Sequence, residues 1–471
     1  MSFWTVLLCI LLVCSASAQS GRTPSATPET PGGGGSELPL KQMFDEVNGY
    51  LRVKAAEYDA RNIPFDDGLF QKLKLEQRQL AARHAARAGL RAEMSVDDRY
   101  YLGMLHWIAE NLDGALAALM QFVSVVDADA AKRQTARSVL TIVLAKQMKL
   151  DEAEAQLAEY LKNQPVKTTE RSRMGTELAK ACQIAKDFKR MAPHAEAGYE
   201  AAKALLKDAS SRARGLDEIL DAAMLVYEAY RDSNDRIKAD ASLDDMRKTA
   251  AEVESPSFYY YAVDQKIKYL IETGRKPAAT AFYTASMVSA ERDFRSKTAG
   301  ADVVARLKKR QKHYLLLGET APPLPLADQW FPGSVKTLAD LRGKVVLLDF
   351  WATWCSPCIE AFPHLIEWYQ DHNRDGFEIL GVTRYYGEVN GSPADNKTET
   401  NFLKQFRQRE RLPYDVVVMK DQTAQFLYGA TALPTAVLID KKGVVRYIEA
   451  GTSSSRIGQM QEVMLKLLAE K

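Results

Sequence analysis

At 471 residues the chain is long enough for two or three domains, and its 46% hydrophobic and 9% aromatic content is ordinary for globular proteins. Its 63 basic and 61 acidic residues leave a formal net charge of only +2. Because the chain lacks the basic excess of a nucleic-acid-binding protein, we expect no nucleic-acid partner.

The N-terminus carries the features of a secretory signal peptide spanning residues 1–18. An apolar run at 3–13 is too short to span a bilayer as a helix, and small residues follow it up to Ala18. The pattern predicts cleavage after Ala18 and export to a periplasmic or other extracytoplasmic space. Lipoprotein anchoring through Cys14 is the less favoured alternative, because Val13 is a poor small-residue neighbour for that processing.

Residues 19–37 are rich in proline and glycine, which predicts a flexible linker. From 38 to 312 the composition changes to Ala, Leu, Glu, Lys and Arg at helical spacing, which predicts an α-helical domain. Breaks between the helices are expected at Gly114, 149–151, Asp187, 234–235 and 274–275. Their spacing of roughly 35–47 residues is typical of helical-hairpin repeats.

The clearest repeat unit covers residues 136–165 and ends at a proline that stops its second helix. It resembles a tetratricopeptide repeat, and residues 101–115 show the same pattern upstream. An irregular helical bundle is the alternative. Either arrangement predicts a surface that binds or positions protein partners. Cys182 lies in an apolar helical stretch, where we expect it to act as a small buried hydrophobic residue.

A second domain is expected at 313–471, and the proline-rich stretch 322–325 near its start marks the end of the helical composition. Strand patterns occur at 344–350, 377–382, 414–419, 435–440 and 444–449. Helical patterns occur at 358–370, 398–409, 423–427 and 455–468. The alternation predicts a mixed sheet covered by helices, with a terminal hairpin at 441–443. The expected fold class is therefore multi-domain, with an all-α helical-hairpin region followed by an α/β domain.

Cys355 and Cys358 fall where the buried strand passes into the next helix. Free backbone N–H groups and the helix dipole stabilise an anion at a helix N-terminus, so a cysteine there ionises readily. A second cysteine one turn later can attack a mixed disulfide formed by the first. The spacing therefore favours dithiol–disulfide exchange. A zinc site completed by His364 or His372, or a purely structural disulfide, are alternatives that the spacing makes less favoured.

Three motifs stand in order around this pair. They are LRGKVVLLDFWATWCSPC at 341–358, Phe-Pro at 362–363 and ALPT at 432–435. Together they resemble the thioredoxin superfamily, and more narrowly the TlpA/ResA-like group of exported thioredoxins. The extra stretch at 383–398, between a strand and the next helix, also suits that group.

The resemblance implies roles for individual residues. Cys355 would be the attacking thiolate, and Cys358 would be the resolving thiol. Pro434 would be a cis-proline facing the redox-active disulfide, leaving the backbone of Leu433 to pair with an extended substrate chain. Trp354 would cover the dithiol and shape access to it. Leu433, Pro434 and Trp354 are therefore the expected substrate-docking residues.

Asp349 stands where thioredoxin carries a buried acid that takes the proton of the resolving thiol. TlpA-like relatives often have Asn there and place a Glu three residues after the second cysteine, but that position is Ala361 in this chain. We therefore expect Asp349 to be the catalytic acid/base, with a pKa raised by burial beside Cys358. The alternative is a solvated residue at the strand end. Glu360 lies one step away around the helix and is expected at the surface.

The sequence thus predicts an exported thiol–disulfide oxidoreductase that reduces disulfides of extracytoplasmic proteins. No cofactor or metal is expected beyond the dithiol, and electrons would come from an unidentified donor protein. One alternative is a helical adaptor whose thioredoxin domain is a redox switch. Another is a peroxiredoxin-like peroxidase, which is less favoured because 353–355 lacks the Pro/Thr-rich loop of those enzymes.

Overall fold

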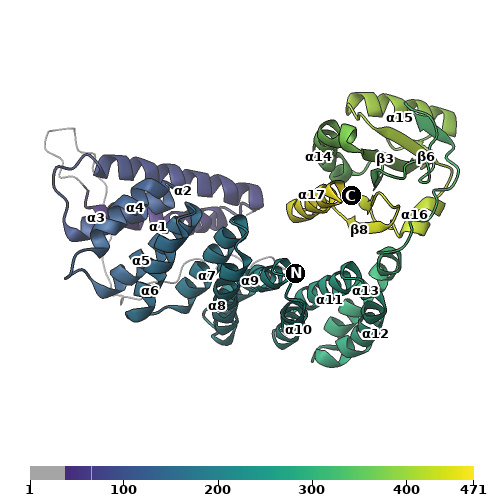
Figure 1. The fold of residues 1–471 in the computed structure, drawn as a ribbon. Coiled ribbons are helices and arrows are strands. Elements are labelled where there is room, and N and C mark those ends of the chain that lie inside the picture. Colours follow the sequence, from purple (N-terminus) through teal and green to yellow (C-terminus); the bar gives the residue numbers. More distant parts are fainter. Residues whose placement is uncertain (1–37, 65, 471) are drawn as a thin grey trace, which may run out of the picture. The chain divides into compact units, whose positions relative to one another are not determined.

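The computed structural model describes residues 38–64 and 66–470. The predicted signal peptide and linker lie outside the described residues. The chain forms two compact units, Met1–Asp245 and Met246–Lys471 (Figure 1). In the described part, no helix combines the length and apolar composition needed to cross a bilayer.

The described part of the first unit is helical, and consecutive helices pack against one another. Its helices are α1 (Leu40–Ala60), α2 (Asp67–Ala88), α3 (Val96–Ile108), α4 (Leu112–Val123), α5 (Ala130–Lys146), α6 (Leu150–Lys162), α7 (Thr168–Ile184), α8 (Phe188–Lys207) and α9 (Arg212–Asp232), and α10 (Arg236–Glu252) crosses into the second unit. The stretch that resembles a tetratricopeptide repeat, 136–165, covers all of α6 and all but the first turns of α5, and the two helices are paired. Cys182 is a free, fully buried thiol, as predicted, and burial raises its pKa to about 11.

Most of the expected helix breaks fall between helices, but the one at Gly114 is wrong. Gly114 lies inside α4, and the break occurs at Asn111, whose side chain accepts a hydrogen bond from the Gly114 N–H at 3.0 Å. This is N-cap geometry, which fixes where the helix begins. Glycine is required here for space, because a Cβ at Gly114 would lie 2.6 Å from the His106 ring.

The helices α7 and α8 approach each other closely through two glycines. A Cβ added to Gly175 would lie 2.7 Å from the Cα of Gly198, a distance that real side chains do not tolerate. Because neither glycine has a side chain, the two backbones can come into contact. The neighbouring side chains of α7 and α8 can then pack closely along the helix pair.

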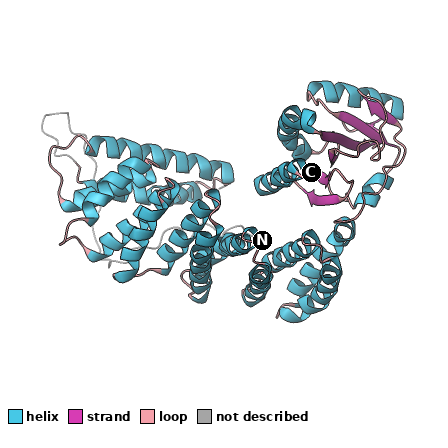
Figure 2. Ribbon diagram, in the orientation of Figure 1, coloured by secondary structure: helices cyan, strands magenta, loops and turns pink. Residues whose placement is uncertain are grey.

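The second unit begins with a helical layer, which we define as α11 (Pro256–Glu272), α12 (Lys276–Asp293) and α13 (Lys297–Leu316). A six-stranded sheet follows in the order β1-β6-β3-β2-β7-β8 (Figure 2). Its strands are β1 (Gln329–Phe331), β2 (Val345–Phe350), β3 (Phe377–Arg384), β6 (Asp415–Met419), β7 (Thr435–Ile439) and β8 (Val445–Ala450). The strands β2, β3 and β6 are parallel, and β1, β7 and β8 pair antiparallel. The predicted mixed sheet and terminal hairpin are confirmed.

Helices cover both faces of this sheet. Side chains of α14 (Ser356–His372), α15 (Asn396–Arg409) and α17 (Ser454–Ala469) pack in one core with alternate residues of the strands. The end of α13 and α16 (Thr423–Tyr428) pack in a second core on the opposite face. All six residues of β2 are buried because it is central and covered on both sides. One of them, Asp349, is a carboxylic acid.

Two elements were not predicted. The edge strand β1 has three residues, too few for a recognisable alternation. It is held by Asp415, whose carboxylate accepts hydrogen bonds from Trp330 and from the Gly333 N–H, each at 3.0 Å. The stretch 383–398 contains the small hairpin β4 (Glu388–Val389) and β5 (Ser392–Pro393).

The close α7–α8 crossing gives a stability prediction. Gly175→Val should destabilise the first unit by about 1–3 kcal/mol, because the new side chain must force the helices apart. Gly49→Ala is the matched control in α1, where a Cβ would meet only the end of Arg52 at 3.9 Å. It should be neutral or stabilising by up to about 1 kcal/mol. Urea unfolding followed by far-UV circular dichroism measures both, and an unchanged midpoint for Gly175→Val would contradict the packing account.

Candidate active site

The two cysteines lie at the start of α14, directly after the central strand β2. Cys355 is the N-cap residue of the helix, and its Sγ accepts a hydrogen bond from the Cys358 N–H at 3.3 Å. Pro357 occupies the first turn, where its missing N–H costs nothing. The sulfur atom therefore lies at the positive end of the helix dipole, beside an N–H donor that would stabilise a thiolate.

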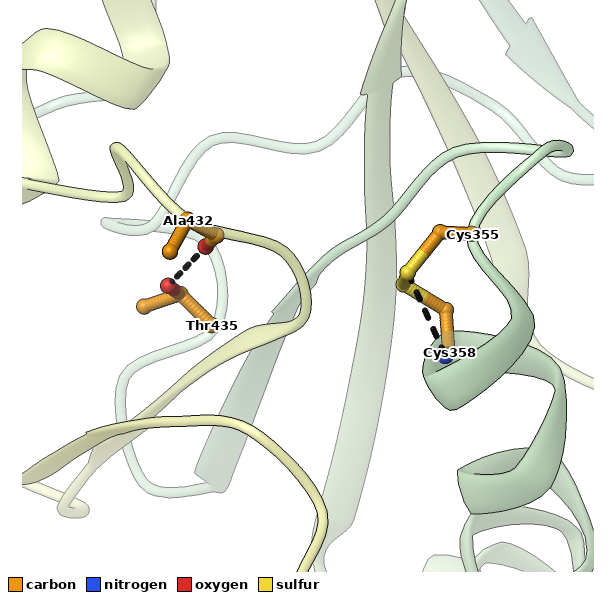
Figure 3. The surroundings of a disulfide bond; sticks show 4 residues. All are labelled: Cys355, Cys358, Ala432 and Thr435. Carbon is orange, nitrogen blue, oxygen red and sulfur yellow. Dashed lines mark hydrogen bonds between the residues drawn. A yellow bond between two sulfur atoms is a disulfide. The ribbon is translucent and has the colours of Figure 1, made fainter. Parts of the chain in front are cut away.

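Cys355 and Cys358 are joined by a disulfide bond, with their Cα atoms 5.3 Å apart (Figure 3). Both are buried, Cys358 completely. Neither histidine of the alternative zinc site joins the cysteines in a cluster of possible metal ligands. His364 is exposed and packs near Trp368, and His372 lies 3.8 Å from Asp375. Among the described residues, no cluster of three or more His, Cys, Asp or Glu side chains could hold a metal ion.

The loop before β7 lies across from the disulfide in Figure 3. The Leu433–Pro434 peptide bond in this loop is cis. Thr435 closes the turn by donating a hydrogen bond from its hydroxyl to the Ala432 carbonyl oxygen at 2.6 Å. Pro434 is buried and Leu433 is half-buried, packed against the same core that contains the cysteines.

A surface groove of about 270 Å³ begins at Trp354 and Leu433. Trp354 is 58% exposed and meets the Tyr386 ring edge-to-face at 5.3 Å. The guanidinium of Arg384 lies 4.0 Å from the centre of the same Tyr386 ring. Phe426, which is 63% exposed, lines the groove as well. The groove thus offers aromatic and cationic surface beside the disulfide.

Arg384, Tyr386 and Phe426 were not predicted from the sequence as residues of this groove. They come from the end of β3, the loop that follows it and the short helix α16. An arginine two residues before a tyrosine, after a strand, carries no distinctive pattern by itself. The position of these residues beside Trp354 depends on the folded sheet.

Asp349 is 4% exposed, so the alternative of a solvated strand-end residue is wrong. Burial raises its pKa to about 7. It lines a small cavity with Ala361 and Leu365, which lie on the same face of α14 as Cys358. Ala361 is itself buried, and Glu360 is exposed, as expected. The structure therefore brings Asp349 beneath the helix face that carries the second cysteine.

Comparison with known proteins finds relatives of the C-terminal part of the chain. Residues 317–448 match the AhpC/TSA family. The thiol-disulfide oxidoreductase ResA of Geobacillus thermodenitrificans (strain NG80-2) is 36% identical over 142 residues, covering 30% of this chain and 74% of that protein. ResA of Bacillus subtilis (strain 168) is 32% identical over 135 residues, covering 29% and 68%. A crystal structure of a thiol-disulfide isomerase from Corynebacterium glutamicum covers 32% of this chain and 98% of its own at 21% identity, with a TM-score of 0.28.

A mixed sheet with a disulfide at the start of a helix and a facing cis-proline defines a thiol-disulfide oxidoreductase of the thioredoxin fold. The chain belongs to the ResA family of these enzymes, through a C-terminal domain that follows a helical region. The predicted family, fold class and enzyme class are confirmed.

The buried carboxyl of Asp349 predicts how the free energy of unfolding depends on pH. The pKa of Asp349 is about 7 in the folded protein and close to 3.8 when unfolded, so the folded state binds the proton more tightly. This preference for the protonated form adds to the free energy of unfolding at low pH. The added stability is lost as the pH rises from about 4 to above 7. At pH 8, Asp349→Asn should therefore stabilise the oxidised protein by roughly 2–4 kcal/mol.

The difference between Asp349→Asn and the wild type should disappear near pH 4, where both side chains are neutral. Urea unfolding at the two pH values measures it, and the exposed Glu360→Gln serves as the control. An equal stabilisation at both pH values would show that the effect comes from packing and not from ionisation.

Proposed function

We propose that the protein reduces disulfide bonds of extracytoplasmic proteins, with Cys355 as nucleophile, Cys358 as resolving thiol and Asp349 as the base. The observation that carries this proposal is the hydrogen bond from the Cys358 N–H to the Cys355 Sγ at the helix start. It favours negative charge on Cys355, while Cys358 is fully buried on the helix face above Asp349.

In the first step the Cys355 thiolate of the reduced protein attacks one sulfur of a client disulfide. A bond forms between Cys355 and that sulfur, the client S–S bond breaks, and the leaving client thiolate takes a proton from solvent. The cis geometry at Pro434 leaves the Leu433 backbone free to pair with an extended client segment. Trp354 and the rest of the groove contact the flanking client side chains.

In the second step Cys358 gives its proton to the Asp349 carboxylate and attacks the Cys355 sulfur. The Cys355–Cys358 disulfide forms and the mixed disulfide breaks, and the client's second sulfur leaves as a thiolate that takes a proton from solvent. Two electrons have passed from the dithiol to the client disulfide. A base with a pKa near 7 suits this transfer, because it accepts the proton and also releases it close to neutral pH.

Three further proposals rest on the sequence. Residues 1–18 would direct export, and the enzyme would work without a bound cofactor, its disulfide being reduced again by an electron-donor protein. The helical region would bind or position partners, since stacked helix pairs offer extended surfaces.

Substitution of the cysteines tests the assignment directly. Cys355→Ser should abolish reduction of insulin disulfides by the purified reduced protein. Cys358→Ala should stop after the first step and accumulate a mixed disulfide that gel electrophoresis and mass spectrometry detect. The control Cys182→Ser should keep full activity, because that thiol is buried in α7 of the first unit.

Full activity of Cys355→Ser would show that the nucleophile is misassigned. Hydrogen peroxide is the alternative oxidant to include in the same assay. Turnover of peroxide together with failure to reduce insulin would favour the peroxidase instead.

A relocated acid tests the role of Asp349. Asp349→Asn should slow insulin reduction at pH 7 roughly 100-fold, because Cys358 loses its proton acceptor. Adding Ala361→Glu to that variant should recover at least about tenfold, because position 361 lines the same cavity and matches the Glu of TlpA-like relatives. Glu360→Gln, on the exposed side of α14, should change nothing. Failure of the double variant to recover, with folding intact, would contradict an acid/base role in this cavity.

A further inference from the structure

The cavity beside Asp349 extends to the edge of the sheet. Pro434, Ala436, Glu449 and Arg456 also line it. Its volume accessible to the centre of a water molecule is about 20 Å³. This is enough for one water, and its lining offers the polar groups that a buried water needs.

The register of the strands explains why this cavity exists. Asp349 on β2 lies opposite Ala436 on β7, which in turn lies opposite Glu449 on β8. The three side chains share one face of the sheet, and the backbones of Asp349 and Glu449 are separated by about 10 Å, two strand spacings. The methyl group of Ala436 fills little of the space between them. Among the described residues, none donates a hydrogen bond to the Asp349 carboxyl.

Side chains of the helical layer hold Glu449 in place on the edge strand β8. It forms ion pairs with Lys268 of α11 and with Arg310 of α13, the latter at 3.0 Å. Arg310 also donates to the carbonyl oxygen of Ile448, which covers the edge of strand β8. Asp264 forms ion pairs with the same two cations, at 2.8 Å from Lys268 and 3.4 Å from Arg310.

We propose that Glu449 is a positioning residue that holds a water in this cavity, through which Asp349 exchanges its proton with solvent, and that Lys268 and Arg310 fix Glu449 there. After Cys358 has passed its proton to Asp349, the protonated carboxyl gives it to the water. The water releases a proton to the solvent and the carboxylate is restored, with no change in electrons. This inference rests on the proposed function, and it joins the helical layer to the redox chemistry.

Charge determines the direction of the expected effects. Glu449→Gln removes an anion and leaves Asp264 as the carboxylate paired with Lys268 and Arg310, so the cluster gains a net positive charge that favours the carboxylate form of Asp349. Lys268→Met removes a cation and has the opposite effect. The titratable and charged groups facing Asp349 or Glu449 from the surrounding elements are Cys358, Tyr414, Tyr447, Arg456, Tyr260, Asp264, Lys268, Arg310 and His313.

The test is the pH dependence of insulin reduction by the full-length reduced protein at low salt. The rate should rise as Asp349 ionises. In Glu449→Gln this rise should move down by roughly 0.5–1 pH unit, and in Lys268→Met it should move up by a similar amount. The double variant should return close to the wild type. In an Asp349→Asn background, Glu449→Gln should produce no shift.

Glu272→Gln is the matched control. It removes an ion pair at 2.7 Å between α11 and Lys466 of α17, and neither residue lines the cavity. It should leave the pH profile unchanged. Shifts in the same direction for Glu449→Gln and Lys268→Met, or no shift in either folded variant, would overturn the inference alone. If the wild type does not reduce insulin, the proposed function fails and this inference falls with it.

Discussion

The transition from strand β2 to helix α14 is the structural constraint on which the thioredoxin-fold domain depends. The central strand must be buried on both faces, and it delivers the chain to a helix whose first N–H groups have no partner within the helix. Cys355 takes the N-cap position, and its sulfur satisfies the Cys358 N–H. The same hydrogen bond that begins the helix would therefore stabilise a Cys355 thiolate in the reduced protein, on which the proposed chemistry depends.

Burial has the opposite effect on Asp349, six residues earlier. A carboxyl in the central strand is costly when ionised, and its raised pKa expresses that cost. The free-energy cost of ionising Asp349 is limited because its carboxyl lines a cavity and is not enclosed by tightly packed core. The proposed exchange requires the two groups to differ: Cys355 would ionise at low pH in the reduced protein, whereas burial keeps Asp349 protonated until near neutral pH. This pairing of a stabilised thiolate with a destabilised carboxylate is the physical basis of the proposed mechanism.

Much of this site could be predicted from the sequence because its signals are local. The pair Cys355 and Cys358, the strand before it and the helix after it lie within about thirty residues, and motif order at 341–358 and 432–435 supplied the family. Glu449 could not be predicted, because its place beside Asp349 depends on register across three strands. Its partner Lys268 comes from a helix far away in the sequence. The break expected at Gly114 failed because a glycine required for packing space looks like a helix breaker in the sequence.

The ionisation of Cys355 tests the central claim most directly. Its thiol pKa can be measured in the reduced full-length protein from the pH dependence of iodoacetamide alkylation, with mass spectrometry to identify the modified residue. The account predicts that Cys355 reacts first, with a pKa at least about one unit below the ordinary value of 8.5, while Cys358 stays unreactive. A Cys355 pKa at or above 8.5, or faster alkylation of Cys358, would contradict it.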